Sequence, residues 1–397
     1  MNELPPLPAT QTNPIGAFDV GDLPGAGELA ALRAALLTAG AQIAFRHQPD
    51  RHTNAVPAGL RRGHTVFGPG RSVDAAFNTN PVHRQKTIAS VVLDEAVLFP
   101  RSMAVLSERL GLFGPSIGHV AFFGSLAALD DQFIDHPGGG PALAHDPASI
   151  ERRDEIALVL GGVGLANYGH FLYDGLPGVL LHKLLLPGIA CHIVGPELQD
   201  WQREALGALG LLDDYLTLER PTRFRKILTT DMLSLHVSYP TRAIRMVFDM
   251  LRFRFGMPQT ARPRVMIRRN HQGNRRVMRN RDEVEAIARS WGFHIVSAET
   301  MSLTEQIRCF AGARVMIGES GAAMANLGFA DPGARVLEIQ PECFLDGWTR
   351  GACRMLGHDW HVSFARVPDV AQGTHSRDFS YDVDTAEFAE TLRIMLA

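Results

Sequence analysis

The 397-residue sequence contains only three lysines, Lys86, Lys183 and Lys226, among its 39 basic residues. Arginine therefore carries nearly all of the positive charge, and its planar guanidinium can bind two phosphate oxygens at once. The formal net charge is −3, so the chain lacks the basic excess of a general nucleic-acid binder. These features exclude nucleic acid as a general partner and direct attention to local clusters of arginine.

Cysteine and long apolar runs are also scarce. The four cysteines show no CxxC spacing and no histidine pattern that would complete a zinc set. No run of 18 apolar residues occurs, and the first residues have neither the basic start nor the apolar core of a secretory signal. We therefore expect a cytoplasmic protein, whose contact with a membrane, if it makes one, is peripheral.

The length predicts two domains of about 150 to 200 residues each. The first 85 residues are rich in Pro, Gly, Asn and Arg and show one helical pattern, over 27–45. From Glu155, short apolar runs alternate with helical patterns, which is typical of a parallel sheet covered by helices. A second alternating set runs over 264–341, where Ser302 and Glu305 form a capping-box pattern.

We therefore predict an α/β fold with two doubly wound, Rossmann-like lobes facing each other across a cleft. Ligands bind at the carboxyl ends of the strands in such sheets. The predicted divisions are an irregular N-terminal arm over 1–85, a first lobe over 86–257, a second lobe over 258–372 and a C-terminal tail or helix over 373–397.

The stretch "IALVLGGVGLANYGHFLYDGLP" joins a strand pattern to a helix pattern. Gly162 and Gly164 fit the first two positions of a GxGxxG dinucleotide fingerprint, but the third position is Asn167. No acidic residue follows a second strand at the expected distance. A nicotinamide-dependent oxidoreductase is therefore the weaker interpretation of this segment.

His170 and Asp174 in the same stretch are four residues apart, which places both side chains on one face of a helix. A carboxylate there can hold the imidazole tautomer or raise its basicity for proton abstraction. A satisfied capping pair at a strand end is the alternative. Pro177 cannot donate a hydrogen bond to Tyr173, so the segment is either one interrupted helix or a helix that begins after Asp174.

Eight arginines lie within twenty residues, at positions 262, 264, 268, 269, 275, 276, 279 and 281, with no carboxylate before Asp282. Such density favours an anionic ligand, and phosphate is the natural one at the carboxyl end of a strand. The alternative is a solvated loop in which only Arg268 and Arg269 are fixed by the strand.

A further strand pattern ends at Glu319, Ser320 and Gly321 and opens into a helix of small residues. Free backbone N–H groups and the helix dipole would bind a diphosphate there, and the small side chains would let it approach closely. Tight helix packing is the other interpretation. Glu338, on the next strand pattern, is expected at the same rim, where it would accept hydrogen bonds from ribose hydroxyls.

Three motifs together resemble glycosyltransferase family 61: "NYGHFLYDGLP", "MIRRNHQGNRRVMRN" and "LTEQIRCFAGARVMIGESGAAMANLGFADPGARVLEIQP". They occur in the family's order. The resemblance implies a GT-B fold, inversion at the anomeric carbon, and no essential metal or other cofactor. The sequence "DVD" at Asp382 lies beyond both predicted lobes and does not suggest a metal site.

The resemblance also implies roles for individual residues. His170 and Asp174 would be catalytic, and Asn167 and Tyr168 would lie on the acceptor side. The donor-binding residues that match the family's motifs are Arg268, Arg275, Arg276, Gly321, Ala322 and Asn326. Arg269, Ser320 and Glu338 are added to this set because they lie at the ends of strand patterns. Two departures stand out, because the family usually has His at the position of Ser320 and an acidic residue at that of Arg281.

The resemblance thus predicts an inverting glycosyltransferase that moves a hexosyl or pentosyl group from a nucleotide-sugar donor to a hydroxyl of a glycan or glycolipid acceptor. Bacterial surface polysaccharide synthesis, with peripheral contact at the inner membrane, is the expected setting; homo-oligomerisation is left open. The main alternative, motivated by Ser320, is a nucleotide-sugar-binding protein without transferase activity. A serine can hydrogen-bond to a phosphate, but it brings no positive charge to the site.

Overall fold

The computed structural model describes residues 13–47, 54–55, 66–67, 82–83, 88–118, 120, 124–231, 243–256, 263–270, 276–344, 347–367 and 379–397. The chain forms two compact units. Unit 1 comprises Met1–Asp50 and Lys86–His236, and unit 2 comprises Arg51–Gln85 and Val237–Ala397. This division differs from the predicted one, because part of the expected N-terminal arm belongs to each unit.

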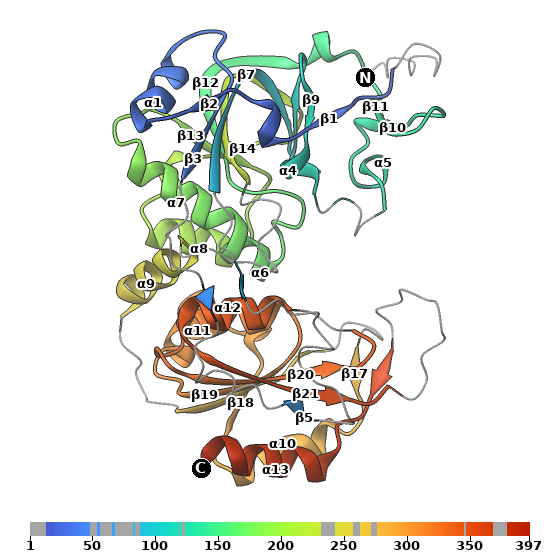
Figure 1. The fold of residues 1–397 in the computed structure, drawn as a ribbon, viewed down its shortest axis with the longest axis vertical. Helices are drawn as coiled ribbons and strands as arrows, with labels where there is room; N and C mark the ends of the chain where they lie inside the picture. Colours follow the sequence, from blue (N-terminus) through green and yellow to red (C-terminus); the bar gives the residue numbers. More distant parts are fainter. Residues whose placement is uncertain are drawn as a thin grey trace. The chain divides into compact units, whose positions relative to one another are not determined.

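Unit 1 is built on a ten-stranded sheet in the order β1-β9-β8-β7-β15-β12-β13-β14, with β3 also paired to β7 and β2 to β3 (Figure 1). Its longest strand, β7 (Ile88–Phe99), is buried along most of its length. The carboxyl-terminal strands of the unit are parallel: β12 (Glu151–Val159) lies between β13 (His192–Gly195) and β15 (Thr222–Thr230).

The prediction of a doubly wound first lobe is wrong for this sheet, because β7 runs antiparallel to β15, to β3 and to β8 (Ala104–Ser107). Only a short turn separates β7 from β8, and a tight turn can join only antiparallel strands. Unit 1 is therefore mixed α/β, with parallel pairing among β12, β13, β14 (Tyr215–Thr217) and β15.

Residues 13–47 do not form an irregular arm. The predicted helix forms as α1 (Leu29–Leu37), but it ends eight residues early, before Gly40, whose φ is 76°. The chain then enters β3 (Ile43–His47), which pairs with β7. Two shorter strands precede α1, namely β1 (Ala17–Phe18), paired with β9 (Gly111–Phe113), and β2 (Gly25–Ala26).

Short elements complete unit 1: α4 (Gly114–Ile117), α5 (Leu126–Leu129), β10 (Phe133–Asp135), β11 (Pro141–Leu143), α7 (Leu176–Leu185) and α8 (Asp200–Ala208). One apolar core of the unit gathers residues from β7, β8 and β9 beneath α5 and β10, including Phe99, Leu106 and Phe133.

Unit 2 contains a six-stranded, wholly parallel sheet in the order β18-β16-β19-β20-β21-β5. Its strands are β16 (Arg264–Ile267), β18 (His294–Val296), β19 (Val315–Glu319), β20 (Arg335–Pro341), β21 (Asp359–Ala365) and β5 (Val66–Phe67). From β16 the chain adds β18 on one side and then β19 to β21 on the other, while β5, from an earlier part of the chain, pairs with β21 at the edge. This doubly wound order confirms the prediction for the second alternating set.

Helices cover both faces of this sheet (Figure 1). One face carries α10 (Arg281–Ser290) and α13 (Thr385–Leu396); the other carries α11 (Leu303–Phe310), the 3₁₀ helix η8 (Ala322–Phe329) and α12 (Trp348–Leu356). The predicted capping box forms at α11, where the Ser302 hydroxyl accepts from the Glu305 N–H and the Glu305 carboxylate accepts from the Ser302 N–H.

Two segments belong elsewhere than predicted. The last helix, α13, is not a tail, because Phe388, Leu392 and Met395 are buried in the core of unit 2 beside Val284 of α10. Helix α9 (Ala243–Phe255), expected to close the first lobe, packs on α11 and η8 of unit 2. In both cases the apolar face of the helix packs on elements that are not adjacent to it in the sequence.

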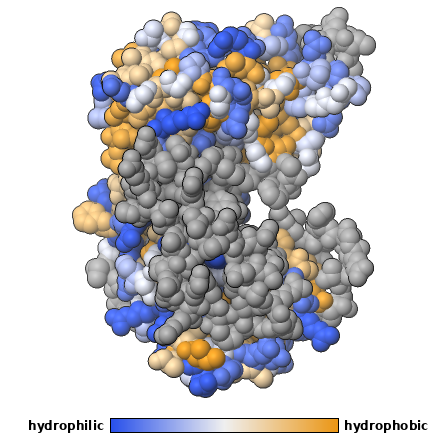
Figure 2. Space-filling view, in the orientation of Figure 1, coloured by the Kyte–Doolittle hydropathy of each residue, from blue (hydrophilic) through white to orange (hydrophobic). Residues whose placement is uncertain are grey.

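Hydrophilic and hydrophobic residues are interspersed on the coloured part of the surface in Figure 2. Within the residues that the structure describes, no helix combines the length and the apolar character needed to cross a membrane.

Candidate active site

The segment that carries His170 begins where β12 ends. Two turns follow the strand, closed by hydrogen bonds from the Leu165 N–H to the Gly162 carbonyl and from the Asn167 N–H to the Gly164 carbonyl. Gly164 has φ 94°, and an added Cβ would lie only 3.3 Å from the His170 ring. Glycine is therefore needed here both for the turn and for room beside the imidazole.

Asn167 forms the N-cap of the helix that follows. Its side-chain oxygen accepts hydrogen bonds from the N–H groups of Gly169 (2.9 Å) and His170 (3.4 Å). Helix α6 (Tyr168–His170) passes into one π turn, η4 (Phe171–Gly175), and then into α7, in which Pro177 occupies the first turn. The widened turn accommodates a proline that cannot donate a backbone hydrogen bond.

The π turn brings the predicted pair together. The Nδ1 atom of His170 lies 3.0 Å from the Oδ2 atom of Asp174. The His170 side chain is 25% exposed, whereas that of Asp174 is 6% exposed. The imidazole thus reaches the surface while the carboxylate lies beneath it. With Nδ1–H donating to Asp174, Nε2 is an acceptor and can receive a proton.

Two residues of α8, which the sequence did not single out, support this segment. Gln202 is buried and donates from Nε2 to the Leu165 carbonyl at 2.9 Å. The Trp201 ring meets the rings of Tyr168 and Phe171 edge-on, with centroids 5.2 and 5.0 Å apart. Tyr168, predicted on the acceptor side, is therefore half-buried against Trp201. Trp201 and Gln202 are far from His170 in the sequence, so only the folded structure shows that they contact this segment.

A second group of candidate residues lies in unit 2, where the doubly wound sheet changes direction between β16 and β19. Arg269 follows β16, and Ser320 follows β19. The Arg269 guanidinium donates to the Ser320 carbonyl at 3.0 Å, and that of Arg276 donates to the same oxygen at 3.2 Å. Two predicted donor-binding arginines therefore converge at the switch point, which is where doubly wound sheets bind ligands.

Arg276 is held in an unusual conformation. Its φ is 53°, a left-handed value that costs energy for a residue with a side chain. Its guanidinium lies over the Phe344 ring, 4.6 Å from the centroid. Phe344 comes just after β20, at the same edge of the sheet, and was not predicted from the sequence.

Behind the arginines, Glu319 is buried with two partners from distant parts of the chain. Arg281 forms an ion pair with its Oε1 at 2.7 Å, and the Tyr381 hydroxyl donates to its Oε2. Burial raises the pKa of the Glu319 carboxyl, and Arg281 and Tyr381 oppose that shift. Arg281 therefore does not face solvent as part of a loop; it neutralises a buried carboxylate beside the rim.

The turn after Glu319 leaves little room for side chains. An added Cβ at Gly321 would lie 3.1 Å from the Arg269 guanidinium. Ser320 is 2% exposed, and its hydroxyl has no hydrogen-bond partner among the described residues. Ala322, which is half-buried, opens the predicted helix of small residues, and this helix is the 3₁₀ helix η8.

The remaining predicted donor residues are placed differently. Arg268 is bound by the Glu285 carboxylate, 2.6 Å from its Nε. Asn326 is fully buried and donates to Gln306 at 2.8 Å, so it braces η8 against α11. Glu338 was expected at the rim to bind ribose, but it is fully buried and accepts hydrogen bonds from Thr349 (2.9 Å) and Trp360 (3.0 Å). Arg275 lies outside the described residues.

The corrections for Asn326 and Glu338 have one cause. Glu338 was assigned by its position near a strand end and Asn326 by its match to the family's helix start. Both side chains instead point into the packed layer, where partners from α11, α12 and β21 satisfy them. A buried carboxylate or amide with its hydrogen bonds made is not available to a ligand.

Comparison with known protein families gives a match to the model described as Glycosyltransferase 61, over residues 168–337. The matched region contains His170, Asp174, Arg269, Arg276 and Ser320. This part of the chain is therefore similar to glycosyltransferase family 61. The match supports glycosyl transfer and gives no support to the nicotinamide-dependent alternative.

Comparison with curated proteins found no match. Among solved structures, the chain is similar to the bacterial iron-containing dodecameric glycosyltransferase TibC from enterotoxigenic E. coli H10407, with 14% identity and a TM-score of 0.29. That similarity covers 66% of this chain and 81% of the TibC chain. The similarity to glycosyltransferase family 61 rests on the family match alone.

Proposed function

We propose that the protein is an inverting, metal-independent glycosyltransferase that moves a sugar from a nucleotide-sugar donor to a hydroxyl of a glycan acceptor, in bacterial surface polysaccharide synthesis. The observation that carries the proposal is the His170–Asp174 pair, 3.0 Å apart, with a partly exposed imidazole above a buried carboxylate. A glycosyltransferase of this kind needs a base for the acceptor hydroxyl, and this pair has the form of one.

In this mechanism Nε2 of His170 takes the proton of the acceptor hydroxyl as its oxygen attacks the anomeric carbon. The bond from that carbon to the diphosphate oxygen breaks, and the diphosphate leaves with the electron pair. A single displacement inverts the anomeric centre. Asp174 is the positioning residue, since it holds the imidazole tautomer and stabilises the imidazolium that forms.

The donor diphosphate is proposed to bind in unit 2. Arg269 and Arg276 supply positive charge beside the Ser320 carbonyl, and Gly321 allows close approach of the phosphates. Charge that develops on the leaving diphosphate is stabilised most by groups already fixed in place. The two units then act as the lobes of a GT-B enzyme, unit 1 for the acceptor, with Asn167 and Tyr168 on that side, and unit 2 for the donor.

The test is the loss of transfer in His170→Ala. We expect the turnover number to fall by about 100-fold or more, within the range of general-base catalysis, while affinity for a nucleoside diphosphate stays unchanged. His192→Ala, which removes an exposed histidine from β13, is the matched control. Release of nucleoside diphosphate from UDP-, GDP-, ADP- and dTDP-sugars, with bacterial surface oligosaccharides as acceptors, measures the rate with and without EDTA.

Wild-type transfer rates in His170→Ala would refute the base assignment, and transfer abolished by EDTA would refute metal independence. A second candidate, a nucleotide-sugar-binding protein without transferase activity, is favoured by Ser320 at the position where the family usually has His. Its signature is tight binding of a nucleotide sugar by the wild-type chain with no turnover on any acceptor.

A further inference from the structure

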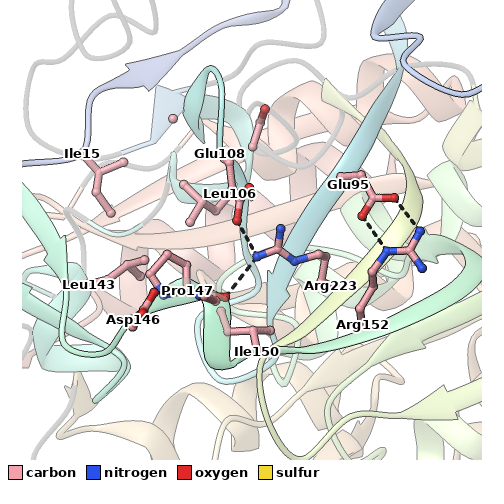
Figure 3. Close-up of a pocket in the computed structure, with 13 residues that line it drawn as sticks. Ile15, Glu95, Leu106, Glu108, Leu143, Asp146, Pro147, Ile150, Arg152 and Arg223 are labelled. Atoms are coloured by element: carbon pink, nitrogen blue, oxygen red, sulfur yellow. Dashed lines mark hydrogen bonds and ion pairs between the residues drawn. The ribbon is translucent and has the colours of Figure 1, made fainter.

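Unit 1 contains a cavity of about 750 Å³ that none of the proposed catalytic or donor-binding residues line. This volume lies within the range of small-ligand sites. Figure 3 shows Arg152 facing Glu95 on one side of the cavity and Arg223 reaching toward Glu108 and Pro147 on another. The apolar part of the lining comes from Ile15, Leu106, Leu143, Pro147 and Ile150.

The cavity lies at the opposite edge of the sheet from His170. Arg152 and Arg223 are register partners near the amino ends of the parallel strands β12 and β15, whereas the His170 segment follows the carboxyl end of β12. Arg152 lies seven positions before Val159 along β12, a span of about 23 Å. A ligand in this cavity therefore does not occupy the proposed catalytic site.

Two backbone irregularities shape the cavity wall. Glu95 interrupts β7 with φ 46°, a left-handed conformation that is unfavourable for glutamate. Directly after Arg152, a register shift between Arg153 and Ile156 makes a bulge in β12. Bulges and strained residues cluster at binding sites because they re-aim side chains. Here the left-handed Glu95 and the bulge after Arg152 lie beside the hydrogen bonds that join these two side chains.

The charges of the lining are matched in pairs. Arg152 binds both carboxylate oxygens of Glu95, at 2.9 and 2.7 Å. Arg223 forms an ion pair with Glu108 and donates to the Pro147 carbonyl at 3.0 Å. Its side chain is only 14% exposed, whereas that of Glu108 is 49% exposed. The wall thus offers fixed hydrogen-bond donors and acceptors without an excess of positive charge.

We propose that this cavity is a second saccharide-binding site, which takes a neutral oligosaccharide. Paired carboxylates and guanidiniums accept from and donate to sugar hydroxyls, while Ile15, Leu143 and Ile150 offer apolar surface to the C–H faces of the ring. An anionic ligand would face three carboxylates, Glu95, Glu108 and Asp146, with both arginines already paired. The choice of a saccharide, rather than another neutral polar ligand, rests on the proposed function.

Binding is tested on the full-length chain with maltotriose, cellotriose and chitotriose as neutral probes, and with trigalacturonate as the anionic probe. Saturation-transfer NMR and calorimetry measure the affinities. Ala148→Trp places a large ring on the exposed rim of the cavity without removing an ion pair. We expect at least one neutral probe to bind, and Ala148→Trp to weaken it at least tenfold. Ala34→Trp, on the exposed face of α1, should leave it unchanged.

Three results would overturn the inference: no binding of any neutral probe, tighter binding of trigalacturonate than of every neutral probe, or equal binding in Ala148→Trp and the wild type. His170→Ala separates this inference from the proposed function. Normal trisaccharide binding in that variant is expected. If the cavity binds a trisaccharide but no transfer activity exists, the proposed function fails and the site remains; if transfer occurs without trisaccharide binding, only the site fails.

Discussion

The two units place polar groups at the carboxyl edge of parallel strands in different ways. In unit 2 the regular, wholly parallel sheet does this by topology, since Arg269 after β16 and Ser320 after β19 meet at the switch point. In unit 1 the sheet is mixed, and the candidate pair follows one strand, on a helix distorted by a π turn. A regular sheet thus fixes where groups converge, whereas a distorted helix fixes how two neighbours are oriented.

The supporting interactions differ in the same way. His170 and Asp174 are close in the sequence, and the residues that hold their segment come from one neighbouring helix, α8. Around the arginines of unit 2, the partners are far apart in the sequence: Glu319 meets Arg281 and Tyr381. Local geometry therefore orients the His170–Asp174 pair in unit 1. In unit 2, contacts between distant segments balance the charge of Glu319.

Acidification should lower the unfolding free energy through one buried histidine in each unit. Burial and the nearby His47 lower the pKa of His182 in unit 1 to about 3, and burial lowers the pKa of His358 in unit 2 to about 4. Each imidazole stays neutral in the folded chain but is protonated in the unfolded chain below about pH 6.5. Unfolding free energy therefore falls as pH falls, by about 2 kcal/mol per histidine between pH 6.5 and 5.

Urea titrations between pH 7.5 and 4.5 measure this effect in the wild type, His182→Gln and His358→Gln. Each variant should lose less stability on acidification than the wild type, and by similar amounts, because both folded-state pKa values lie below this range. His47, whose pKa is also lowered by burial, remains in both variants. A pH dependence that neither variant changes would contradict the burial of neutral imidazoles.

Arg276→Ala tests the proposal that the donor binds in unit 2. The variant removes a guanidinium that donates to the Ser320 carbonyl and stacks on Phe344. Loss of one hydrogen bond to a charged group costs about 1.5 to 3 kcal/mol, so the affinity for nucleoside diphosphates should fall about 10- to 100-fold. Calorimetry with UDP, GDP, ADP and CDP measures it.

Arg314→Ala is the control, because Arg314 is exposed directly before β19, at the other edge of the same sheet. Equal losses of affinity in the two variants would mean that general positive charge, rather than the rim at Ser320, attracts the ligand. Unchanged affinity in Arg276→Ala would remove this arginine from the donor site.

Glycine-to-alanine changes compare how readily each unit accommodates one added methyl group. An added Cβ at Gly175 would come within 2.3 Å of the Leu160 carbonyl oxygen, which the strand end holds in place; at Gly318 it would meet the flexible Met324 side chain. Gly175→Ala should lower the unfolding free energy by about 1 to 3 kcal/mol, the usual range for overpacking, and Gly318→Ala by less.

Urea midpoints of the two variants, measured in parallel, test this difference. Gly175→Ala should also slow transfer, since the shift it forces lies next to Asp174. If Gly318→Ala is the more destabilising of the two, the surroundings of Gly318 in unit 2 tolerate an added Cβ less well than those of Gly175 in unit 1, which contradicts the prediction.

Some parts of the site could be predicted because the relevant geometry is local. Spacing of four residues placed His170 and Asp174 together, and a strand pattern followed by arginines or small residues placed Arg269, Arg276 and Ser320 at one edge. Burial could not be predicted in the same way. Glu338 and Asn326 lie near the expected positions, but Thr349, Trp360 and Gln306 occupy their polar atoms.

The sequence by itself determined the alternation of strands and helices in unit 2, the capping box of α11 and the spacing of the His–Asp pair, since periodicity and short-range hydrogen bonds decide these. Only the tertiary structure decided that the first sheet is mixed, that α13 completes a core, that Glu285 binds Arg268, and that a cavity lies at the far end of β12. Strand direction, side-chain burial and ion pairing depend on which distant segments pack together, and no local pattern records that choice.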